Sequence, residues 1–334
     1  MPLILERKQV LDVFAEANKH KWTLPAFNAE NITTVEAILE SAKEYGEKIG
    51  NEELPIIIGI TNNYKDRPQS VYYTHTRRWD IGLRLFLSDL SVLTSAESPY
   101  GKLKVLIFLD HIQWDVDKEL LDWDMSQFSG IMFDASTLPI EENIKKTAAF
   151  VEQNRDKIVI EGACDEIASK GHFDKNELTT PELAERYFNE TGVDIVVANL
   201  GTEHRASAAE LKYHGELARK IKERIGNHIC LHGTSSVPTD KLGKLFVDGV
   251  CKVNIWTTLE RDTTPELFID MIKNASKIIG AKKAEKLFEK KLIGENADKE
   301  SELSLDYFTT KYRQDLIFKQ MQSIIKKYFE LWYV

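Results

Sequence analysis

The stretch Lys104–Asp110, which reads KVLIFLD, ends directly before His111 and decides the fold. Its apolar residues follow one another without a break, which is typical of a parallel strand that is covered on both faces. A carboxylic acid and an imidazole follow at once, where the strand would end. Polar residues at the carboxyl end of a parallel strand are typical of a reaction site, so this stretch predicts both a buried strand and a place for chemistry.

Similar short runs rich in Val, Ile and Phe alternate with amphipathic stretches along the chain. Strands that alternate with helices predict βαβ units and a parallel sheet, and eight such units suggest closure into a barrel. The sequence therefore predicts an α/β fold, a (βα)8 TIM barrel over residues 1–290 with a C-terminal helical extension over residues 291–334. The other expected strands are Thr23–Asn28, Pro55–Thr61, Gly130–Ser136, Lys157–Gly162, Asp194–Leu200, His228–His232 and Cys251–Trp256.

Helices are expected between these strands. Apolar residues at helical spacing predict a helix over residues 31–47. The segments Thr180-Pro181-Glu182 and Thr264-Pro265-Glu266 each place a cap residue before a proline, which predicts a helix start at both points. Gly192 and Gly280 stand where these helices should end. Two further helices are expected over residues 6–19, before the first strand, and over residues 81–94.

Composition limits the classes of function. The net charge of −9 and the pI near 5.5 argue against a nucleic-acid partner. No apolar run of about 18 residues is present, so neither a membrane span nor a membrane partner is expected. The three cysteines, Cys164, Cys230 and Cys251, have no close paired spacing, which indicates a reducing compartment and predicts a cytoplasmic location.

Three histidines occupy equivalent places in this pattern. His111, His204 and His232 each lie at or just past the end of an expected strand. In a (βα)8 barrel these ends and the loops after them form the reaction face. Three imidazoles there can hold one catalytic Zn²⁺ and leave a coordination position open for substrate. The sequence therefore predicts a zinc site with these three histidines as metal ligands.

Six segments at the expected strand ends resemble the class II, zinc-dependent fructose-bisphosphate aldolase family. Each segment by itself is a weak signal, but all of them occur in order and each lies on its own strand end. The resemblance covers residues 8–290. The six segments are Pro25-Ala26-Phe27-Asn28, Leu109-Asp110-His111, Ile131-Met132-Phe133-Asp134-Ala135-Ser136, Gly201-Thr202-Glu203-His204, Leu231-His232-Gly233-Thr234-Ser235 and Val253-Asn254-Ile255.

The resemblance implies a reaction and a set of roles. Asp110 would polarise or protonate the aldehyde carbonyl in condensation, and Asn254 would contact the ketose or enediolate. The reaction would be reversible aldol cleavage through a zinc-stabilised enediolate, in which the metal acts as a Lewis acid and a carboxyl beside it moves a hydroxyl proton. The further candidates for substrate binding are Asn28, Thr61, Arg205, Gly233, Ser235 and Thr257.

The chain departs from the family at the fifth expected strand, Lys157–Gly162. The family carries Glu-x-Glu there, whereas this chain has Glu161 followed by Ala163. Glu161 is predicted to be a metal ligand; the alternative is that it contacts the ligands rather than the metal itself. Cys164 is a further candidate ligand. The acidic loop that follows is shortened, and Glu166 is its predicted catalytic proton carrier.

The positions that bind phosphate in the family are also altered. Arg205 and Ser236 stand where the family has glycines, Ala208 replaces a lysine, and Trp256 replaces an aspartate. Glycines let backbone N–H groups approach a phosphate, so these changes reshape the pocket. Arg205 offers a guanidinium fork for an anion. The sequence leaves open which sugar is bound and whether it is phosphorylated.

Three functions remain open at this point. The first is a class II aldolase of carbohydrate metabolism that acts on a small-molecule sugar or sugar phosphate, as a homo-oligomer (dimer or tetramer). The second is a sugar epimerase or isomerase on the same zinc site, which would release no aldehyde. The third is a non-catalytic ligand-binding relative. Asp110 argues against the third, because a pure binding protein needs no acid beside a zinc ion.

Overall fold

Eight parallel strands form a closed barrel in the computed structural model, which describes residues 3–65, 67–165, 178–202 and 213–334. Each strand pairs with its neighbours in the chain, and β8 closes the barrel against β1. The predicted (βα)8 barrel is confirmed. The strands are β1 (Leu24–Asn28), β2 (Pro55–Thr61), β3 (Lys104–Gln113), β4 (Gly130–Asp134), β5 (Val159–Ala163), β6 (Ile195–Val197), β7 (Ile229–Leu231) and β8 (Val250–Ile255).

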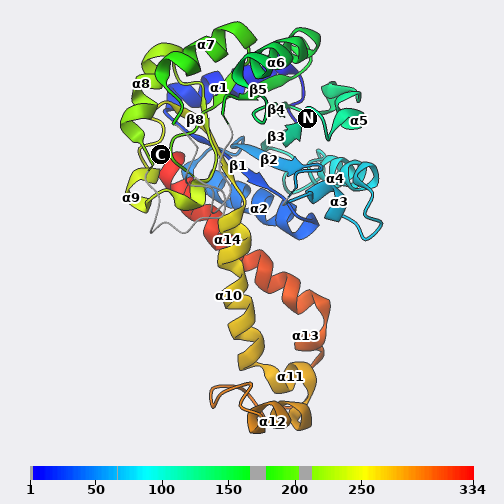
Figure 1. Ribbon diagram of the computed structural model, residues 1–334. Helices are drawn as coiled ribbons and strands as arrows, with labels where there is room; N and C mark the ends of the chain where they lie inside the picture. The colour runs from blue at the N-terminus through cyan, green and yellow to red at the C-terminus, as the bar shows by residue number, and fades with distance from the viewer. Residues whose placement is uncertain (1–2, 66, 166–177, 203–212) are drawn as a thin grey trace. The chain divides into compact units, whose positions relative to one another are not determined.

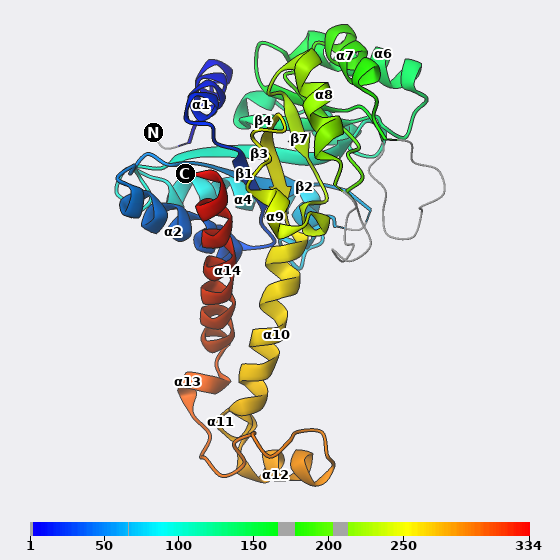
Figure 2. The same cartoon turned by 90° about the vertical axis from the view of Figure 1, so that its left-hand side faces the viewer.

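Helices surround these strands (Figure 1). Figure 2 shows α6, α7 and α8 side by side along one flank of the barrel. The described helices that accompany the strands are α1 (Arg7–His20), α2 (Ile32–Ile49), α3 (Gln69–Tyr72), α4 (Trp79–Leu93), α5 (Lys118–Leu121), α6 (Ile140–Asn154), α7 (Pro181–Thr191), α8 (Gly215–Ile225) and α9 (Thr239–Leu242), with the short 3₁₀ turns η1 (Met125–Gln127) and η2 (Thr234–Ser236).

Local capping explains where two of these helices begin and end. The side chain of Asn31 accepts hydrogen bonds from the backbone N–H groups of Thr33 and Thr34 at the start of α2. The hydroxyl of Thr180 accepts from the N–H of Leu183 at the start of α7, and Gly192 ends that helix with a φ of 71°. The predicted start and end of α7 are therefore confirmed.

The predicted helix start at Thr264-Pro265-Glu266 is wrong. Helix α10 (Thr257–Lys273) begins earlier and continues through Pro265. A proline inside a helix removes one backbone hydrogen bond. The hydroxyl of Thr264 donates to the carbonyl of Glu260 at 2.9 Å, which gives this turn a side-chain bond. A cap residue before a proline therefore does not mark a helix start when the preceding residues already continue the helix.

The chain divides into two compact units. The first contains Met1–Trp256 together with Lys326–Val334, and the second contains Thr257–Ile325. Within the second unit the hydroxyl of Tyr312 donates to Asp270, which ties α14 to α10. The division predicted after residue 290 stays a prediction. The helices after α10 are α11 (Ala275–Ile279), α12 (Ala281–Glu289), α13 (Leu305–Phe308) and α14 (Thr310–Trp332).

The last turns of α14 belong to the barrel unit. Phe329 and Tyr333 are almost fully buried, and the ring of Phe329 lies 5.9 Å from the ring of Phe27 on β1. The indole N–H of Trp332 donates to the carbonyl of Leu242 at 2.8 Å. The aromatic C-terminus is thus buried against the barrel. Among the helices that the structure describes, none combines the length and apolar character needed to cross a membrane.

Candidate active site

An irregularity in β3 brings Asp110 and His111 to the same site. The step from Leu109 to Ile112 on β3 lies opposite the shorter step from Ile131 to Phe133 on β4, so β3 contains one extra residue. His111 has a φ of 50°, which a residue other than glycine seldom adopts. Neighbouring residues of a regular strand point to opposite faces, so without this bulge one of the two side chains would leave the barrel interior.

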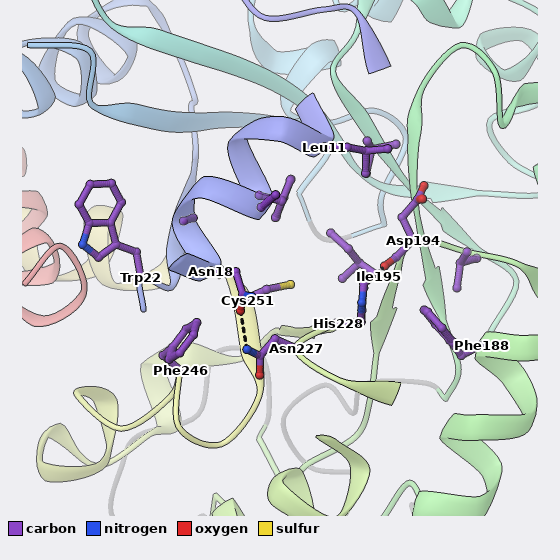
Figure 3. A pocket seen from close by; sticks show the side chains of 15 residues that line it. Leu11, Asn18, Trp22, Phe188, Asp194, Ile195, Asn227, His228, Phe246 and Cys251 are labelled. Carbon is purple, nitrogen blue, oxygen red and sulfur yellow. Dashed lines mark hydrogen bonds between the residues drawn. The ribbon is translucent and has the colours of Figure 1, made fainter. Parts of the chain in front are cut away.

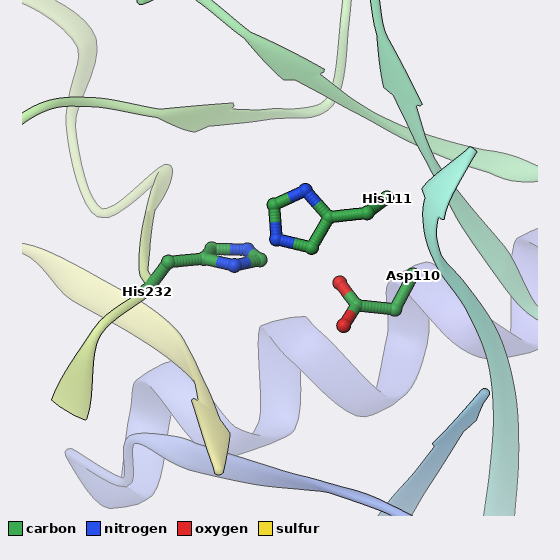
Figure 4. Close-up of side chains that lie close together, drawn as sticks. All are labelled: Asp110, His111 and His232. Carbon is green, nitrogen blue, oxygen red and sulfur yellow. The ribbon is translucent and has the colours of Figure 1, made fainter. Parts of the chain in front are cut away.

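His232 completes a buried group with Asp110 and His111. It follows β7, and its ring lies 4.8 Å from the ring of His111 at an interplanar angle of 75°. The candidate ligand atoms of the three residues all lie within 4.8 Å of one another. Figure 4 shows the carboxylate and both imidazoles facing a common space. The predicted strand-end positions of His111 and His232 therefore do bring the two side chains together.

Asp134 holds the ring of His111. Its Oδ2 lies 3.3 Å from the Nδ1 of His111, and its Oδ1 accepts from the hydroxyl of Ser136 at 2.6 Å. Burial alone would raise the pKa of Asp134, but His111 and Ser136 outweigh burial and lower it. A carboxylate on one imidazole nitrogen orients the ring and directs the other nitrogen, Nε2, to a metal.

Three donors converge on the carboxylate of Asp110. Its Oδ2 accepts from Asn28 Nδ2 and from an Arg67 amino group, each at 2.8 Å, and its Oδ1 accepts from Asn254 Nδ2 at 2.7 Å. Burial alone would raise the pKa of Asp110, but the neighbouring His111 and Arg67 hold it well below its usual range. Asp110 is therefore an ionised, firmly positioned acceptor.

A second buried ion pair lies beside this group. The ammonium of Lys252 on β8 lies 2.9 Å from Glu161 Oε1 on β5, and both side chains are almost fully buried. Lys252 also donates to Asn254 Oδ1. Burial works against the charge of Lys252, but the negative charges of Glu161 and Asp110 outweigh it and raise the pKa of the ammonium. Lys252 therefore stays protonated at neutral pH.

The donor set fits a divalent metal ion at one end of this network. Two imidazoles beside a carboxylate are typical ligands or near neighbours of Zn²⁺. Glu161, Cys230 and His232 form a second possible group, but the ammonium of Lys252 already neutralises Glu161. Burial raises the pKa of the Cys230 thiol, which disfavours the thiolate form that metals require. The His111–His232 end is therefore the better metal site.

The other predicted site residues lie in several different places. Thr61 is fully buried, and its hydroxyl donates to the carbonyl of Arg67, so it fixes the loop after β2. Gly233 turns the chain after His232 with a φ of 67°, and Ser235 lies in η2. Thr257 begins α10 in the second unit. The predictions for Glu166, His204, Arg205 and Ala208 lie outside the described residues.

Glu161 in β5 and Cys164 directly after it stay predictions as metal ligands. Glu161 has the lysine partner described above. Cys164 is 2% exposed, and burial raises the pKa of its thiol. Its backbone N–H and carbonyl bond to Val197 and to the Asn143 side chain. These contacts are those of a core residue.

Two residues of the site, Lys252 and Arg67, are not indicated by the sequence motifs. Lys252 interrupts the apolar run of β8 two residues before Asn254, at a spacing that places both side chains on the same face of a strand. A charged residue at an interior position needs a partner, and that was the available signal. Arg67 lies in the loop after β2, and no local pattern marks it as part of the site.

A separate cavity of about 400 Å³ lies at the opposite end of the barrel. Figure 3 shows side chains from α1 and from the amino ends of strands around it, including Leu11, Trp22 and Asp194. Arg7 of α1 pairs with Asp194 at 2.6 Å, so this helix is tied to the barrel bottom. The amino-terminal face of a TIM barrel serves stability rather than catalysis, which favours the His111–His232 end as the functional site.

Comparisons with known proteins agree with this architecture. Residues 8–331 match the family described as "Fructose-bisphosphate aldolase class-II". The fructose-bisphosphate aldolase of Staphylococcus epidermidis is 27% identical over 266 residues, which cover 77% of this chain and 82% of that protein. The enzyme of Staphylococcus aureus is 26% identical over 292 residues, covering 85% and 91%.

Solved structures show the same fold. The fructose-bisphosphate aldolase of Campylobacter jejuni superposes with a TM-score of 0.77 at 17% identity and covers 99% of this chain and 95% of that chain. The YdjI aldolase of Escherichia coli K12 gives 0.65 at 16% identity, covering 96% and 94%. The match over residues 8–331 means that this chain belongs to the class-II fructose-bisphosphate aldolase family, as its strand-end motifs predict. Membership supports an aldolase-type function, and the family generally uses a divalent metal ion.

The histidine cluster leads to a first prediction. Single His111→Ala, His204→Ala and His232→Ala variants should each lose most of the roughly one zinc ion per chain that a three-histidine site holds. His228→Ala is the control, because His228 is exposed and precedes β7. Elemental analysis of the purified proteins measures the metal content. Full zinc occupancy in all three variants would refute the assignment.

The Lys252–Glu161 pair leads to a second prediction. Lys252→Met leaves Glu161 buried without a cation and should lower the free energy of unfolding by about 3–5 kcal/mol, measured by urea denaturation. The double variant Lys252→Met/Glu161→Leu should recover most of this loss. Lys48→Met, which breaks the exposed pair with Glu330, should cost at most about 1 kcal/mol. Equal losses in the single and double variants would show that the unpaired charge is not the cause.

Proposed function

We propose that this protein is a zinc-dependent aldolase that reversibly cleaves a ketose phosphate or a related sugar. The observation that carries the proposal is the buried carboxylate of Asp110, whose oxygens lie within 4.8 Å of the candidate ligand atoms of His111 and His232. A carboxylate beside a metal site is what aldol cleavage needs, because a hydroxyl proton must leave as the carbon–carbon bond breaks.

His111 and His232, with His204 as the third ligand, would hold the metal. When bound, a Zn²⁺ ion supplies positive charge that stabilises the oxyanion of a cleaved ketose as a Lewis acid. Asp134 keeps the ring of His111 in the orientation that binding requires. In this proposal His111 and His232 are metal ligands, and Asp134 is the residue that orients His111.

Asp110 moves the proton of the reacting hydroxyl. In the cleavage direction its carboxylate accepts that proton, the C–O bond becomes a carbonyl, and the carbon–carbon bond electrons pass to the carbon next to the ketone. In condensation Asp110 returns the proton to the new alkoxide. Asn28 and Asn254 donate to Asp110 and hold its two oxygens in place. Glu166 is proposed to carry the proton of the carbon next to the ketone.

The proposed substrate contacts surround this carboxylate. Asn28 and Asn254 lie within hydrogen-bond distance of Asp110, so a substrate that approaches Asp110 also reaches their amides. Gly233, Ser235, Arg205 and Thr257 are proposed as further contacts because of their motif positions. An epimerase or isomerase would use the same groups without releasing an aldehyde, so product analysis separates the two functions.

Asp110→Asn tests the proposed function directly. This variant keeps a similar shape and should keep its zinc, but it should lose cleavage by about 10²-fold or more, because the amide cannot accept the proton. A screen of phosphorylated and unphosphorylated ketoses for aldehyde release, with a coupled aldehyde assay, measures this. Asp12→Asn on exposed α1 is the matched control. Activity within a few-fold of wild type would mean that another group moves the proton, and conversion without aldehyde would favour an epimerase or isomerase.

The altered phosphate positions lead to a prediction about selectivity. We expect low activity on fructose 1,6-bisphosphate, because Arg205, Ala208, Ser236 and Trp256 replace the residue types that the family uses around phosphate. The measurement compares kcat/KM on the bisphosphate with values on mono-phosphorylated, acidic and neutral ketoses. An efficiency of about 10⁴ M⁻¹s⁻¹ or more on the bisphosphate, above all other substrates, would refute this expectation.

We also propose that the protein is a homo-oligomer, a dimer or a tetramer. The second unit exposes several large apolar side chains, and Phe268, Leu292 and Leu305 are each more than half exposed. Clusters of exposed apolar residues are typical of protein–protein interfaces. Light scattering should therefore give a mass that is a multiple of 38.3 kDa. A monomeric mass at micromolar concentration would contradict the proposal.

A further inference from the structure

Arg67 places a guanidinium against the carboxylate of Asp110. The loop that carries it is fixed at both sides, because the Arg67 carbonyl accepts from the Thr61 hydroxyl and from the Gln69 N–H at 3.0 Å. Gln69 in turn accepts from Asn28 Nδ2 at 3.1 Å, which ties the loop to β1. The position of Arg67 is therefore built into the site.

One N–H donor of the Arg67 guanidinium, Nε, is available to a ligand. One amino group donates to Asp110 Oδ2 at 2.8 Å, while Nε has no hydrogen-bond partner among the residues that the structure describes. The Arg67 side chain is only 9% exposed, so solvent does not readily satisfy this N–H. A buried donor without an acceptor is unfavourable, and a ligand atom that enters the site would satisfy this N–H.

Two aromatic rings flank the same guanidinium. Its central carbon lies 4.9 Å from the ring centroid of Trp256 and 5.8 Å from that of Tyr64. Trp256 is held by its indole N–H, which donates to Glu30, and the Tyr64 ring stacks on His111 at 4.3 Å. These contacts orient the planar cation and connect it to the metal end of the site.

The shape and charge of this group favour a carboxylate as its ligand. Lys252, the other buried cation beside Asp110, is already paired with Glu161. The guanidinium presents a planar fork that matches a planar, singly charged carboxylate. A phosphate is usually bound by several backbone N–H groups, and Ser236 and Trp256 alter the chain where the family binds phosphate.

We propose that Arg67 binds a carboxylate on the aldehyde half of an acidic sugar substrate. The aldehyde half is specified because Arg67 contacts Asp110, the group that moves the proton of the hydroxyl that becomes the aldehyde. The inference rests on the proposed aldolase function and narrows its substrate class to sugar acids. The ring centroid of Trp256 lies 4.9 Å from the guanidinium carbon, so the ring covers one side of the cation.

Direct binding tests the role of Arg67 without turnover. Calorimetry of the zinc-loaded protein with glycerate and with glycerol 3-phosphate compares a carboxylate with a phosphate on the same three-carbon frame. Glycerate should bind more tightly than glycerol 3-phosphate, and Arg67→Met should weaken glycerate about tenfold or more, since a hydrogen-bonded charge pair is lost. Arg78→Met is the matched control, because Arg78 is exposed and pairs only locally with Asp80.

Arg67→Lys keeps the charge but removes the planar fork, and it should give an intermediate affinity. Zinc content and melting temperature are measured for each variant. If Arg67→Met loses zinc, the affinity of Arg67→Lys for glycerate is compared with that of wild type instead. Unchanged glycerate affinity in Arg67→Met, full affinity in Arg67→Lys, or tighter binding of the phosphate by wild type would each overturn the inference.

Turnover separates this inference from the aldolase proposal. Condensation of dihydroxyacetone phosphate with tartronate semialdehyde or with glyceraldehyde compares an acidic with a neutral aldehyde. Wild type should prefer the acidic aldehyde, and Arg67→Met should lose that preference. If the protein has aldol activity but Arg67→Met keeps the wild-type preference for the acidic aldehyde, the inference about Arg67 is overturned and the aldolase proposal stands. Arg67-dependent glycerate binding without any aldol reaction would overturn the aldolase proposal and support the carboxylate site.

Discussion

The bulge of β3 is the constraint on which the site depends. A regular strand would send Asp110 and His111 to opposite faces, and the barrel interior would receive only one of them. The extra residue and the positive φ of His111 bring both side chains inward. A left-handed residue other than glycine costs on the order of 1–3 kcal/mol, and it persists where the surrounding structure holds it. Strand pairing continues on both sides of the bulge, which provides that support.

A single amide joins the two buried ion pairs of the barrel. Asn254 accepts from Lys252 with its oxygen and donates to Asp110 with its nitrogen. Because an ammonium can only donate, Lys252 determines which end of the amide faces it, and the NH₂ group must then face Asp110. The Glu161–Lys252 pair thus determines which end of the Asn254 amide faces the Asp110 carboxylate. Replacing the charged pair by an apolar pair would remove this constraint on Asn254.

The sequence is a good guide to the barrel and a partial guide to the site. The strands follow from uninterrupted apolar runs, and the Thr180-Pro181 pair correctly predicts the start of α7. The same kind of pair at Thr264-Pro265 fails because the preceding residues already form a helix. Strand-end positions predict that His111 and His232 meet. The partners of Lys252 and Arg67 depend on contacts between distant strands and loops, which no local periodicity encodes.

Trp256 stands where the resemblance to the family predicts an aspartate, and its effect on the site depends on its contact with Arg67. An aspartate there would offer Arg67 a second carboxylate and could draw the guanidinium away from Asp110. A tryptophan instead offers a ring face 4.9 Å from the guanidinium carbon and removes a competing negative charge. The charge of Arg67 is then available to Asp110 and to an anion that enters the site. We therefore propose that Trp256, which follows β8, affects substrate choice through both the shape of the pocket and the availability of its cation.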